Sequence, residues 1–237
     1  MINTILFDLD GTILPMDLEK FLYSYFKNLA IHLKDYINPN ILTDIMMECT
    51  NLMISNTKSI PNQDVFMSRF DELVDGDIEM YKAEFSNFYD NLFQEVKSTT
   101  WKNPNIIESI KILKEKGYKV VIATNPLFPM KANHHRIRWA GLDPTDFSYI
   151  SSYEENSYCK PNVDFYKEVL TKINKFPKEC MMVGNDFYED MIAGKLGIET
   201  YLITDNLVNR HEKQIEPNHK GTYKDFLAFV KSLDGIY

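Results

Sequence analysis

The chain has 237 residues, of which 44% are hydrophobic, and its formal net charge is −8 at pH 7. This composition supplies a sizeable core, either in one domain with an insertion or in two small domains. It does not favour nucleic-acid binding, because there is no dense Lys/Arg run to form a basic patch.

The cysteines and the apolar segments bear on location. Cys49, Cys159 and Cys180 form no CxxC pair, and their number is odd. Such a set is typical of a reducing cytosol, so we expect a cytoplasmic protein. No apolar stretch approaches the roughly 18 residues that a membrane span needs. We expect no signal peptide either, because no basic segment followed by a long apolar stretch begins the chain.

An apolar run over residues 2–7 predicts a buried first strand, and the segment DLDGT (residues 8–12) follows it directly. Residues i and i+2 of an extended chain point the same way, so Asp8 and Asp10 should emerge side by side. Gly11 lets the backbone turn and approach a ligand closely. Two carboxylates this close repel each other unless a cation, a shared proton or catalytic chemistry accounts for them. The segment therefore predicts an active site.

Residues 16–100 carry aromatic and aliphatic side chains at helical spacing, and Gly76 is their only glycine. We expect two hinges to flank this block, near Pro15–Asp17 and near Thr100–Asn103. Phe21 and Tyr25 fit either the interior of the block or the wall of a pocket, because periodicity does not distinguish the two. The pattern predicts helices at roughly 17–36, 39–56, 62–74 and 77–96.

Strands and helices alternate from about residue 102 onward. The alternation predicts βα units and therefore an α/β fold, a Rossmann-like parallel sheet with helices on both faces. The helical block would then be an inserted α-helical cap domain (16–100) in a core domain formed by 1–15 and 101–237. We predict strands at 118–124, 147–151, 179–183 and 199–203, and helices at 106–116, 131–140, 163–173, 189–196 and 222–233.

Polar residues follow the predicted strands at the edge where open parallel sheets bind ligands. Thr124 and Asn125 follow the second strand, Lys160 follows the third, and Asp186 and Asp190 follow the fourth. Such a gathering at one edge is hard to obtain from core packing alone.

Taken in order, DLDGT (8–12), TN (124–125), KP (160–161) and GNDFYEDMIAG (184–194) resemble the motifs of the haloacid dehalogenase (HAD) superfamily, in its phosphatase branch. The helical block lies where this family inserts its cap. The resemblance implies an enzyme: a Mg²⁺-dependent phosphatase that hydrolyses a small phosphorylated metabolite through an aspartyl-phosphate. We expect it to act as a monomer or homodimer.

The resemblance also implies the chemical roles. Asp8 would be the nucleophile, and Asp10 would protonate the leaving oxygen and later activate water. Asp10 disfavours dehalogenation, since a halide leaves without a proton. Lys160 would supply positive charge beside the transferring phosphoryl group. Gly11, Thr124 and Asn125 would bind phosphate.

For the metal, the implied Mg²⁺ ligands are Asp8, the main-chain carbonyl of Asp10, and Asp186. Asp190 would lie behind them, holding bound water or orienting its neighbours. Asp190 also fits the N-cap of the helix after it. Gly184 stands one place earlier than usual, with Asn185 directly before the metal aspartate, which leaves the local loop geometry open.

Other interpretations remain. A phosphomutase of the β-phosphoglucomutase kind would use the same aspartates but return phosphate to sugar, and a non-catalytic binding protein could keep the fold. A calcium loop is disfavoured, because the sixth position from Asp8 is Ile13 instead of glycine. We expect Cys159 to be packed and inert. The adjacent His134, His135, Arg136 and Arg138 are expected on a solvated helix surface.

Overall fold

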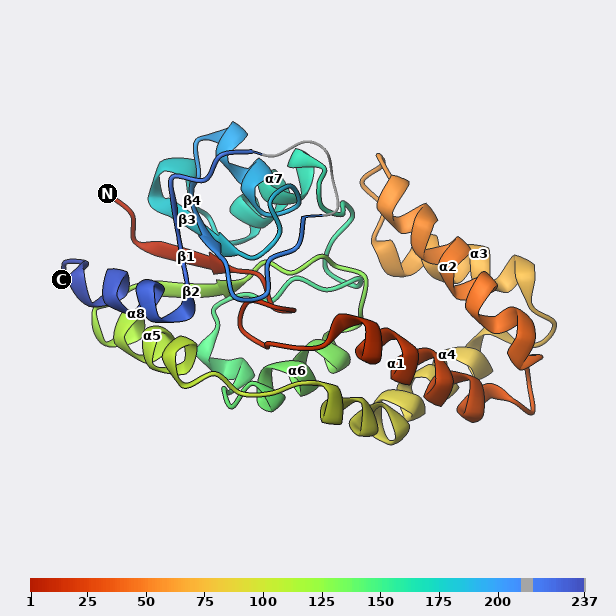
Figure 1. The fold of residues 1–237 in the computed structure, drawn as a ribbon. Coiled ribbons are helices and arrows are strands. Elements are labelled where there is room, and N and C mark those ends of the chain that lie inside the picture. Colours follow the sequence, from red (N-terminus) through yellow and green to blue (C-terminus); the bar gives the residue numbers. More distant parts are fainter. Residues whose placement is uncertain (210–214, 237) are drawn as a thin grey trace.

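The computed structural model describes residues 1–209 and 215–236, and a parallel sheet forms its centre (Figure 1). The strand order is β2-β1-β3-β4-β5, and every neighbouring pair is parallel. This order places β1 and β3 side by side where the chain changes direction across the sheet, which is where doubly wound folds bind ligands. The strands are β1 (Thr4–Phe7), β2 (Lys119–Ile122), β3 (Cys180–Gly184), β4 (Glu199–Ile203) and β5 (His219–Gly221).

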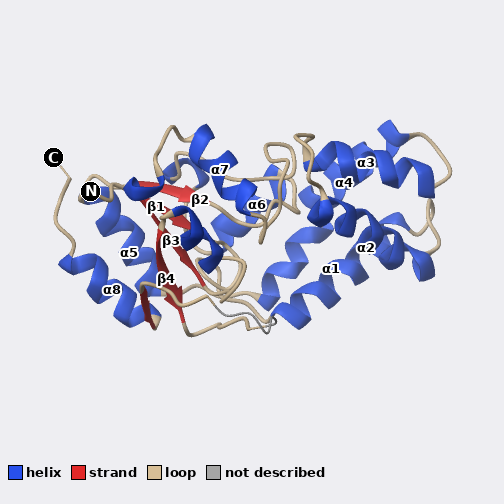
Figure 2. Cartoon of the chain, turned by 90° about the horizontal axis from the view of Figure 1, so that it is seen from above, coloured by secondary structure: helices blue, strands red, loops and turns tan. Residues whose placement is uncertain are grey.

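Helices cover both faces of the sheet, because alternate residues of each strand point to opposite faces. Phe7 of β1 contacts the face covered by α5 (Pro104–Glu115) and α8 (Tyr223–Ser232), which pack side by side (Figure 2). Leu6 points to the other face, against α7 (Val163–Lys172). Strands buried on both faces read as continuous apolar runs, which is why the sequence revealed them. The predicted α/β class is confirmed.

The helical block lies beyond the carboxyl ends of the strands (Figures 1 and 2). Its interior is aromatic. Tyr25 packs edge-to-face on Phe88 and Phe93, with ring centroids 5.7 and 6.2 Å apart, and Phe21 packs on Phe93 in the same way. Phe21 and Tyr25 are therefore core residues of the block. Its elements are α1 (Leu18–Leu33), α2 (Pro39–Ser55), α3 (Asn62–Leu73), α4 (Ile78–Asp90) and a 3₁₀ segment (Leu92–Thr99).

The two linkers of the block run side by side. Met16 and Thr100 form an antiparallel bridge, and the amide of Trp101 donates to the carbonyl of Pro15 over 3.0 Å. At a second place, where α3 begins, the amide of Asn62 donates to the carbonyl of Asn156, 2.9 Å away. The amide of Gln63 likewise donates to the carbonyl of Tyr153 over 2.8 Å.

Several predicted elements differ in the structure. The helix expected over 77–96 ends at Asp90, because Asn91 leaves the helical region (φ −116°, ψ −92°) and a 3₁₀ segment follows. The strand expected at 147–151 is reduced to one bridge, Ile122 to Ile150, beside β2. The helix expected at 189–196 is a 3₁₀ segment, Met191–Leu196. Strand β5 was missed because His-Lys-Gly carries no apolar pattern.

The remaining predicted helix of the α/β half is α6 (Met130–Trp139). In the part of the chain that the structure describes, no helix combines the length and apolar character that crossing a membrane demands.

Candidate active site

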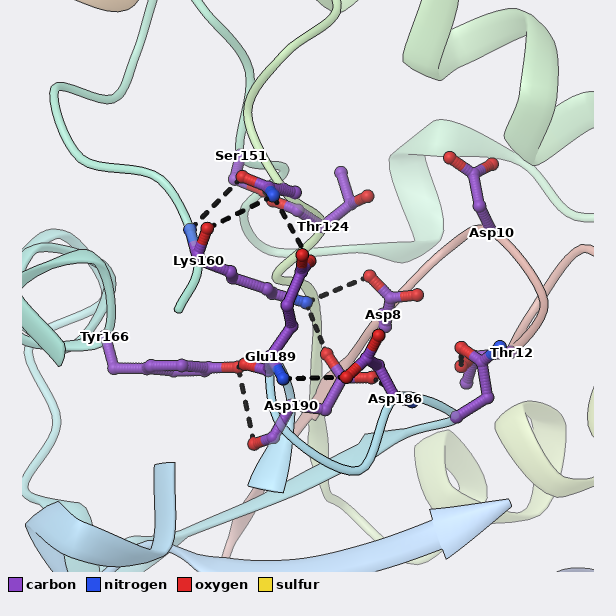
Figure 3. Close-up of polar contacts among 12 residues, drawn as sticks. Asp8, Asp10, Thr12, Thr124, Ser151, Lys160, Tyr166, Asp186, Glu189 and Asp190 are labelled. Carbon is purple, nitrogen blue, oxygen red and sulfur yellow. Dashed lines mark hydrogen bonds and ion pairs between the residues drawn. The ribbon is translucent and has the colours of Figure 1, made fainter. Parts of the chain in front are cut away.

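The predicted site residues meet at the carboxyl edge of the sheet (Figure 3). The loop after β1 brings Asp8 and Asp10, the loop after β2 brings Thr124 and Asn125, and the loop after β3 brings Asp186 and Asp190. Lys160, from the segment before α7, points its ammonium group into the middle of this group. Residues separated by up to 182 positions in the chain, from Asp8 to Asp190, thus share one site.

Lys160 lies between two carboxylates. Its Nζ atom is 2.9 Å from Oδ1 of Asp8 and 2.6 Å from Oδ1 of Asp190, and only 1% of its side chain is exposed. Burial alone would lower the pKa of Lys160, but Asp190 and Asp8 more than offset this, so its pKa lies well above the ordinary value. The lysine therefore carries a positive charge, as its predicted role requires.

The two carboxylates have unusual proton affinity as well. Burial raises the pKa of Asp8, although Lys160 acts in the opposite direction and Asp10 adds to the rise. Burial also raises the pKa of Asp190 to about 7, again against Lys160. Burial therefore dominates the rise at both carboxylates, and one ammonium group facing two of them leaves an excess of negative charge in the site.

Asn125 fixes the backbone at Lys160. Its side-chain Oδ1 accepts from the Lys160 amide over 3.2 Å, and its Nδ2 donates to the Lys160 carbonyl over 3.4 Å. The same Nδ2 donates to Glu189 over 3.2 Å. The neighbouring Tyr166 hydroxyl donates to the Glu189 carbonyl over 2.8 Å. The side chain of Asn125 therefore ties the loop after β2 to the lysine segment and to the loop after β3.

The loop after β3 is closed by its own carboxylates. Oδ2 of Asp190 accepts from the amide of Asp186 over 2.9 Å, while Oδ1 of Asp186 accepts from the amides of Tyr188 and Glu189, each over 2.8 Å. Gly184 makes this possible, since a Cβ there would lie 2.1 Å from Oδ2 of Asp190. Asp190 occupies the predicted N-cap position, but its side chain makes no capping bond to the 3₁₀ segment that follows.

The loop after β1 docks on Asn185. The Thr12 hydroxyl donates to Oδ1 of Asn185 over 3.0 Å, and Nδ2 of Asn185 donates to the Asn206 carbonyl over 2.6 Å. Gly11 has φ +82°, and a Cβ on it would lie 2.3 Å from Nδ2 of Asn185. The asparagine that departs from the commonest motif therefore joins the first and last site loops.

Thr124 is buried near the start of the loop after β2, close to the carboxylates of the site. Its carbonyl accepts from the hydroxyl of Ser151 over 2.7 Å, which holds the loop against the chain that runs beside β2.

Arg136 is the functional candidate that sequence reasoning missed. It was expected on a solvated surface, but its side chain is 0% exposed and forms an ion pair with Oδ2 of Asp10. It also donates to Oδ1 of Asn133 and lies over the ring of Phe128, with its guanidinium carbon 4.3 Å from the ring centroid. The solvated interpretation of this arginine is wrong, whereas the neighbouring Arg138 is exposed as expected.

A cavity of about 320 Å³ opens over these groups. Its floor holds the predicted carboxylates together with Thr124 and Asn125, and its opposite wall is apolar, with Leu18 and Leu22 from α1 and Ile54 from α2. A larger, more open groove of about 1030 Å³ between α2 and α3 contains none of the predicted site residues. The cavity at the sheet edge is thus lined by carboxylates and polar groups on one side and by apolar side chains of the helical block on the other.

As a candidate metal centre, the site offers oxygen atoms and negative charge. No three His, Cys, Asp or Glu side chains among the described residues are spaced to hold a metal ion by themselves. The expected ligand set asks for only two side chains, Asp8 and Asp186, plus the main-chain carbonyl of Asp10. Hard oxygen ligands and uncompensated charge fit Mg²⁺, which keeps several waters and substrate oxygens in its shell.

The curated proteins similar to this chain include two that differ in their named activity. Pyrophosphatase PpaX of Anoxybacillus flavithermus is 28% identical over 202 residues, covering 82% of this chain and 79% of that protein. The glyceraldehyde 3-phosphate phosphatase of Methanothermobacter thermautotrophicus is 28% identical over 116 residues, covering 48% of this chain and 50% of that protein.

Among solved structures, the HAD phosphatase from Thermococcus onnurineus superposes with a TM-score of 0.62 and 18% identity, over 99% of this chain and all (100%) of the other. A likeness at that identity shows the fold alone. The model of the family described as haloacid dehalogenase-like hydrolase matches residues 2–197. Because this match spans most of the chain and contains every predicted motif, the chain belongs to the haloacid dehalogenase-like hydrolases, as the sequence resemblance predicted.

Proposed function

We propose that this hydrolase is a phosphatase that cleaves a small phosphate monoester through an aspartyl-phosphate on Asp8. The observation that carries the proposal is the buried contact of Asp8 with Lys160, at 2.9 Å, on the floor of the cavity. A carboxylate beside a fixed ammonium group can attack phosphorus while the charge on the phosphoryl oxygens is compensated. The phosphatase names of the relatives support the same reaction.

The positions of the other residues support the roles that we propose for them. Thr124 and Asn125 lie on the cavity floor next to Asp8, where phosphoryl oxygens would bind. Asp10 lines the same cavity towards the helical block, where the ester oxygen would leave, so it is placed to give that oxygen a proton. Water would then lose a proton to Asp10 and cleave the intermediate, which returns Asp8 as a carboxylate.

We propose Asp8, Asp186 and the carbonyl of Asp10 as Mg²⁺ ligands, with Asp190 behind them. When bound, the ion would neutralise charge on the phosphoryl oxygens. Chelation with EDTA should abolish turnover, and added Mg²⁺ should restore it. Full activity in excess EDTA would contradict the metal assignment.

The helical block 16–100 would act as the cap over a core of 1–15 and 101–237. Its apolar residues Leu18, Leu22 and Ile54 line the cavity opposite the carboxylates. We therefore propose that the organic part of the substrate contacts these side chains. A ligand enclosed in about 320 Å³ must be small, which favours a metabolite over a macromolecule.

The test is Asp8→Asn, assayed for phosphate release from p-nitrophenyl phosphate and from a panel of sugar phosphates, nucleotides and phosphoglycolate. We expect turnover to vanish while the circular dichroism spectrum and melting curve keep the folded shape. The matched control is Asp71→Asn, which changes an exposed aspartate on α3 and should leave turnover unchanged. Wild-type turnover in Asp8→Asn would refute the proposal. An isomerised sugar phosphate in place of free phosphate would identify a mutase, and metal binding without phosphate release would identify a binding protein.

A further inference from the structure

Arg136 is a fully buried cation on an otherwise unremarkable helix. An arginine is always protonated in proteins, so burying one demands a partner for its charge. Among the described residues its ion-pair partner is Asp10, which lies 126 positions earlier in the chain. Asp10 itself is 29% exposed, towards the cavity. The arginine therefore contacts the site only through Asp10, the residue to which we assign proton transfer.

The two oxygens of Asp10 have different surroundings. Oδ2 accepts from Nη1 of Arg136, whereas Oδ1 is buried and has no hydrogen-bond partner. An unpartnered buried oxygen asks for an explanation, since nearly all such atoms are bonded in native proteins. An oxygen this enclosed offers no second anchor, so among the described residues the ion pair of Oδ2 with Arg136 is what orients this carboxyl group.

Arg136 is itself held in place. Its Nη2 donates to Oδ1 of Asn133, whose Nδ2 donates to the Ser151 carbonyl over 2.8 Å. The guanidinium plane also stacks on Phe128, and Phe128 lines the cavity. Because the guanidinium group is planar, its contacts with the Phe128 ring and the Asn133 side chain fix the direction of its remaining N–H donors. It therefore dictates where the carboxylate of Asp10 points.

We propose that Arg136 is a positioning residue for the departure of the leaving group: it anchors Oδ2 of Asp10 and thereby fixes the orientation of the carboxyl group that serves the ester oxygen. This inference rests on the proposed phosphatase reaction. In the first step a carboxylate oxygen of Asp8 bonds to phosphorus and the bond from phosphorus to the ester oxygen breaks. The carboxyl group of Asp10 gives its proton to that oxygen and becomes the carboxylate paired with Arg136, so the products are an alcohol and the aspartyl-phosphate.

The leaving group provides a readout that a purely structural role would not affect. Departure of p-nitrophenolate needs little help from an acid, whereas departure of an alkoxide depends on it. The experiment measures kcat/KM, which reports the steps through transfer to Asp8, for p-nitrophenyl phosphate, phenyl phosphate and an alkyl phosphate. The ratio between substrates on one enzyme preparation does not depend on what fraction of that preparation is folded.

Arg136→Met should lower kcat/KM for the alkyl phosphate about 100-fold, within the range that general acid catalysis contributes, but change it less than about threefold for p-nitrophenyl phosphate. Arg136→Lys should recover part of the loss, because it keeps a charge but not the fork. Asp10→Asn should give the same substrate ratio as Arg136→Met, and the double variant should shift that ratio no further. The matched control is Arg138→Met, on the exposed face of α6.

Equal losses on all three substrates in both Arg136 variants would overturn the inference and leave Arg136 a structural residue. A further shift of the ratio in the double variant would also overturn it, because Arg136 would then act by a route other than Asp10. Failure of the proposed function would look different. Either the wild type would release no phosphate from any of the esters, or Asp8→Asn would retain activity, and both inferences would fall together.

Discussion

Two buried cations serve the same sheet edge in different ways. Lys160 comes from a loop and lies between two carboxylates, Asp8 and Asp190, at 2.9 and 2.6 Å. Arg136 comes from α6, faces the single carboxylate of Asp10 and stacks on Phe128. A compact ammonium group can bind several carboxylate oxygens around it, whereas a planar guanidinium group binds one partner in a fixed orientation. In the proposed mechanism, Lys160 then belongs to the centre around the attacking group and Arg136 to the centre around the leaving group.

The largest effect is expected from removing the first cation. Lys160→Met leaves Asp8 and Asp190 buried without their counter-charge, so kcat should fall at least about 10²-fold. The unfolding free energy should fall by about 3 kcal/mol, as when one partner of a buried ion pair is removed. Steady-state kinetics and urea unfolding measure both. Lys167→Met, on the exposed side of α7, is the control and should change neither. Near-normal turnover in Lys160→Met would contradict the prediction that the reaction at Asp8 depends on this cation.

The second centre is broken from the carboxylate side. Asp10→Asn leaves the Arg136 charge buried without its ion-pair partner, and we expect the unfolding free energy to fall by about 2 kcal/mol, less than for a fully enclosed pair. Adding Arg136→Met should recover part of this loss, because replacing both partners is less costly than removing one. A double variant no more stable than Asp10→Asn would show that the two groups are not coupled.

A smaller change sharpens the first centre without touching a charge. Gly184→Ala would place a Cβ 2.1 Å from Oδ2 of Asp190, so the carboxylate that holds Lys160 must move. We expect a loss of about 1–3 kcal/mol in unfolding free energy, typical of overpacking. Gly194→Ala is the matched control, since its Cβ would meet Thr200 at an ordinary 3.7 Å. Equal thermal melting of the two variants would contradict the tight contact.

The smallest effect concerns the thiol beside Lys160. Burial, the largest cause, raises the pKa of Cys159 to about 12, so the thiol stays protonated at pH 8 in the folded protein. Cys49 and Cys180 are raised in the same direction, to about 11 and about 12. Iodoacetamide should therefore label the native protein very slowly at pH 8 and all three cysteines in urea. Fast native labelling, followed by mass spectrometry, would show a thiolate next to the lysine.

The contrast between the two cations also shows what a sequence can reveal. Lys160 was predictable because it precedes a proline in a series of ordered motifs. Arg136 was not, because its partner Asp10 lies far away in the chain and its neighbours His134, His135 and Arg138 suggest a wet surface. A usable signal did exist. Ala132, Arg136 and Ala140 recur every four residues, which places the arginine on the same face as two small, buried side chains.

The fold divides in the same manner. Strands with apolar runs were predictable because both of their faces are buried. The segment at 147–151 follows the edge of β2 through backbone bonds, such as Ser148 to the Val120 carbonyl at 2.9 Å, and its one bridge falls short of a strand. A 3₁₀ segment stands where a helix was expected near Asp190, because the carboxylate oxygens of Asp186 and Asp190 accept hydrogen bonds from amides of the same loop. Where polar groups bond locally, periodicity stops being informative.

The paired linkers at Pro15 and Trp101 have a mechanical consequence. The two covalent connections between the helical block and the sheet lie side by side and form one seam, so any rigid-body motion of the block would turn about that seam. Such a rotation would break the hydrogen bond between Asn62 and Asn156, whereas the bond between Trp101 and Pro15 at the seam would be kept. Because Leu22 lies farther along α1 from the seam than Leu18, it would travel farther, and the apolar wall would retreat from its outer rim inward.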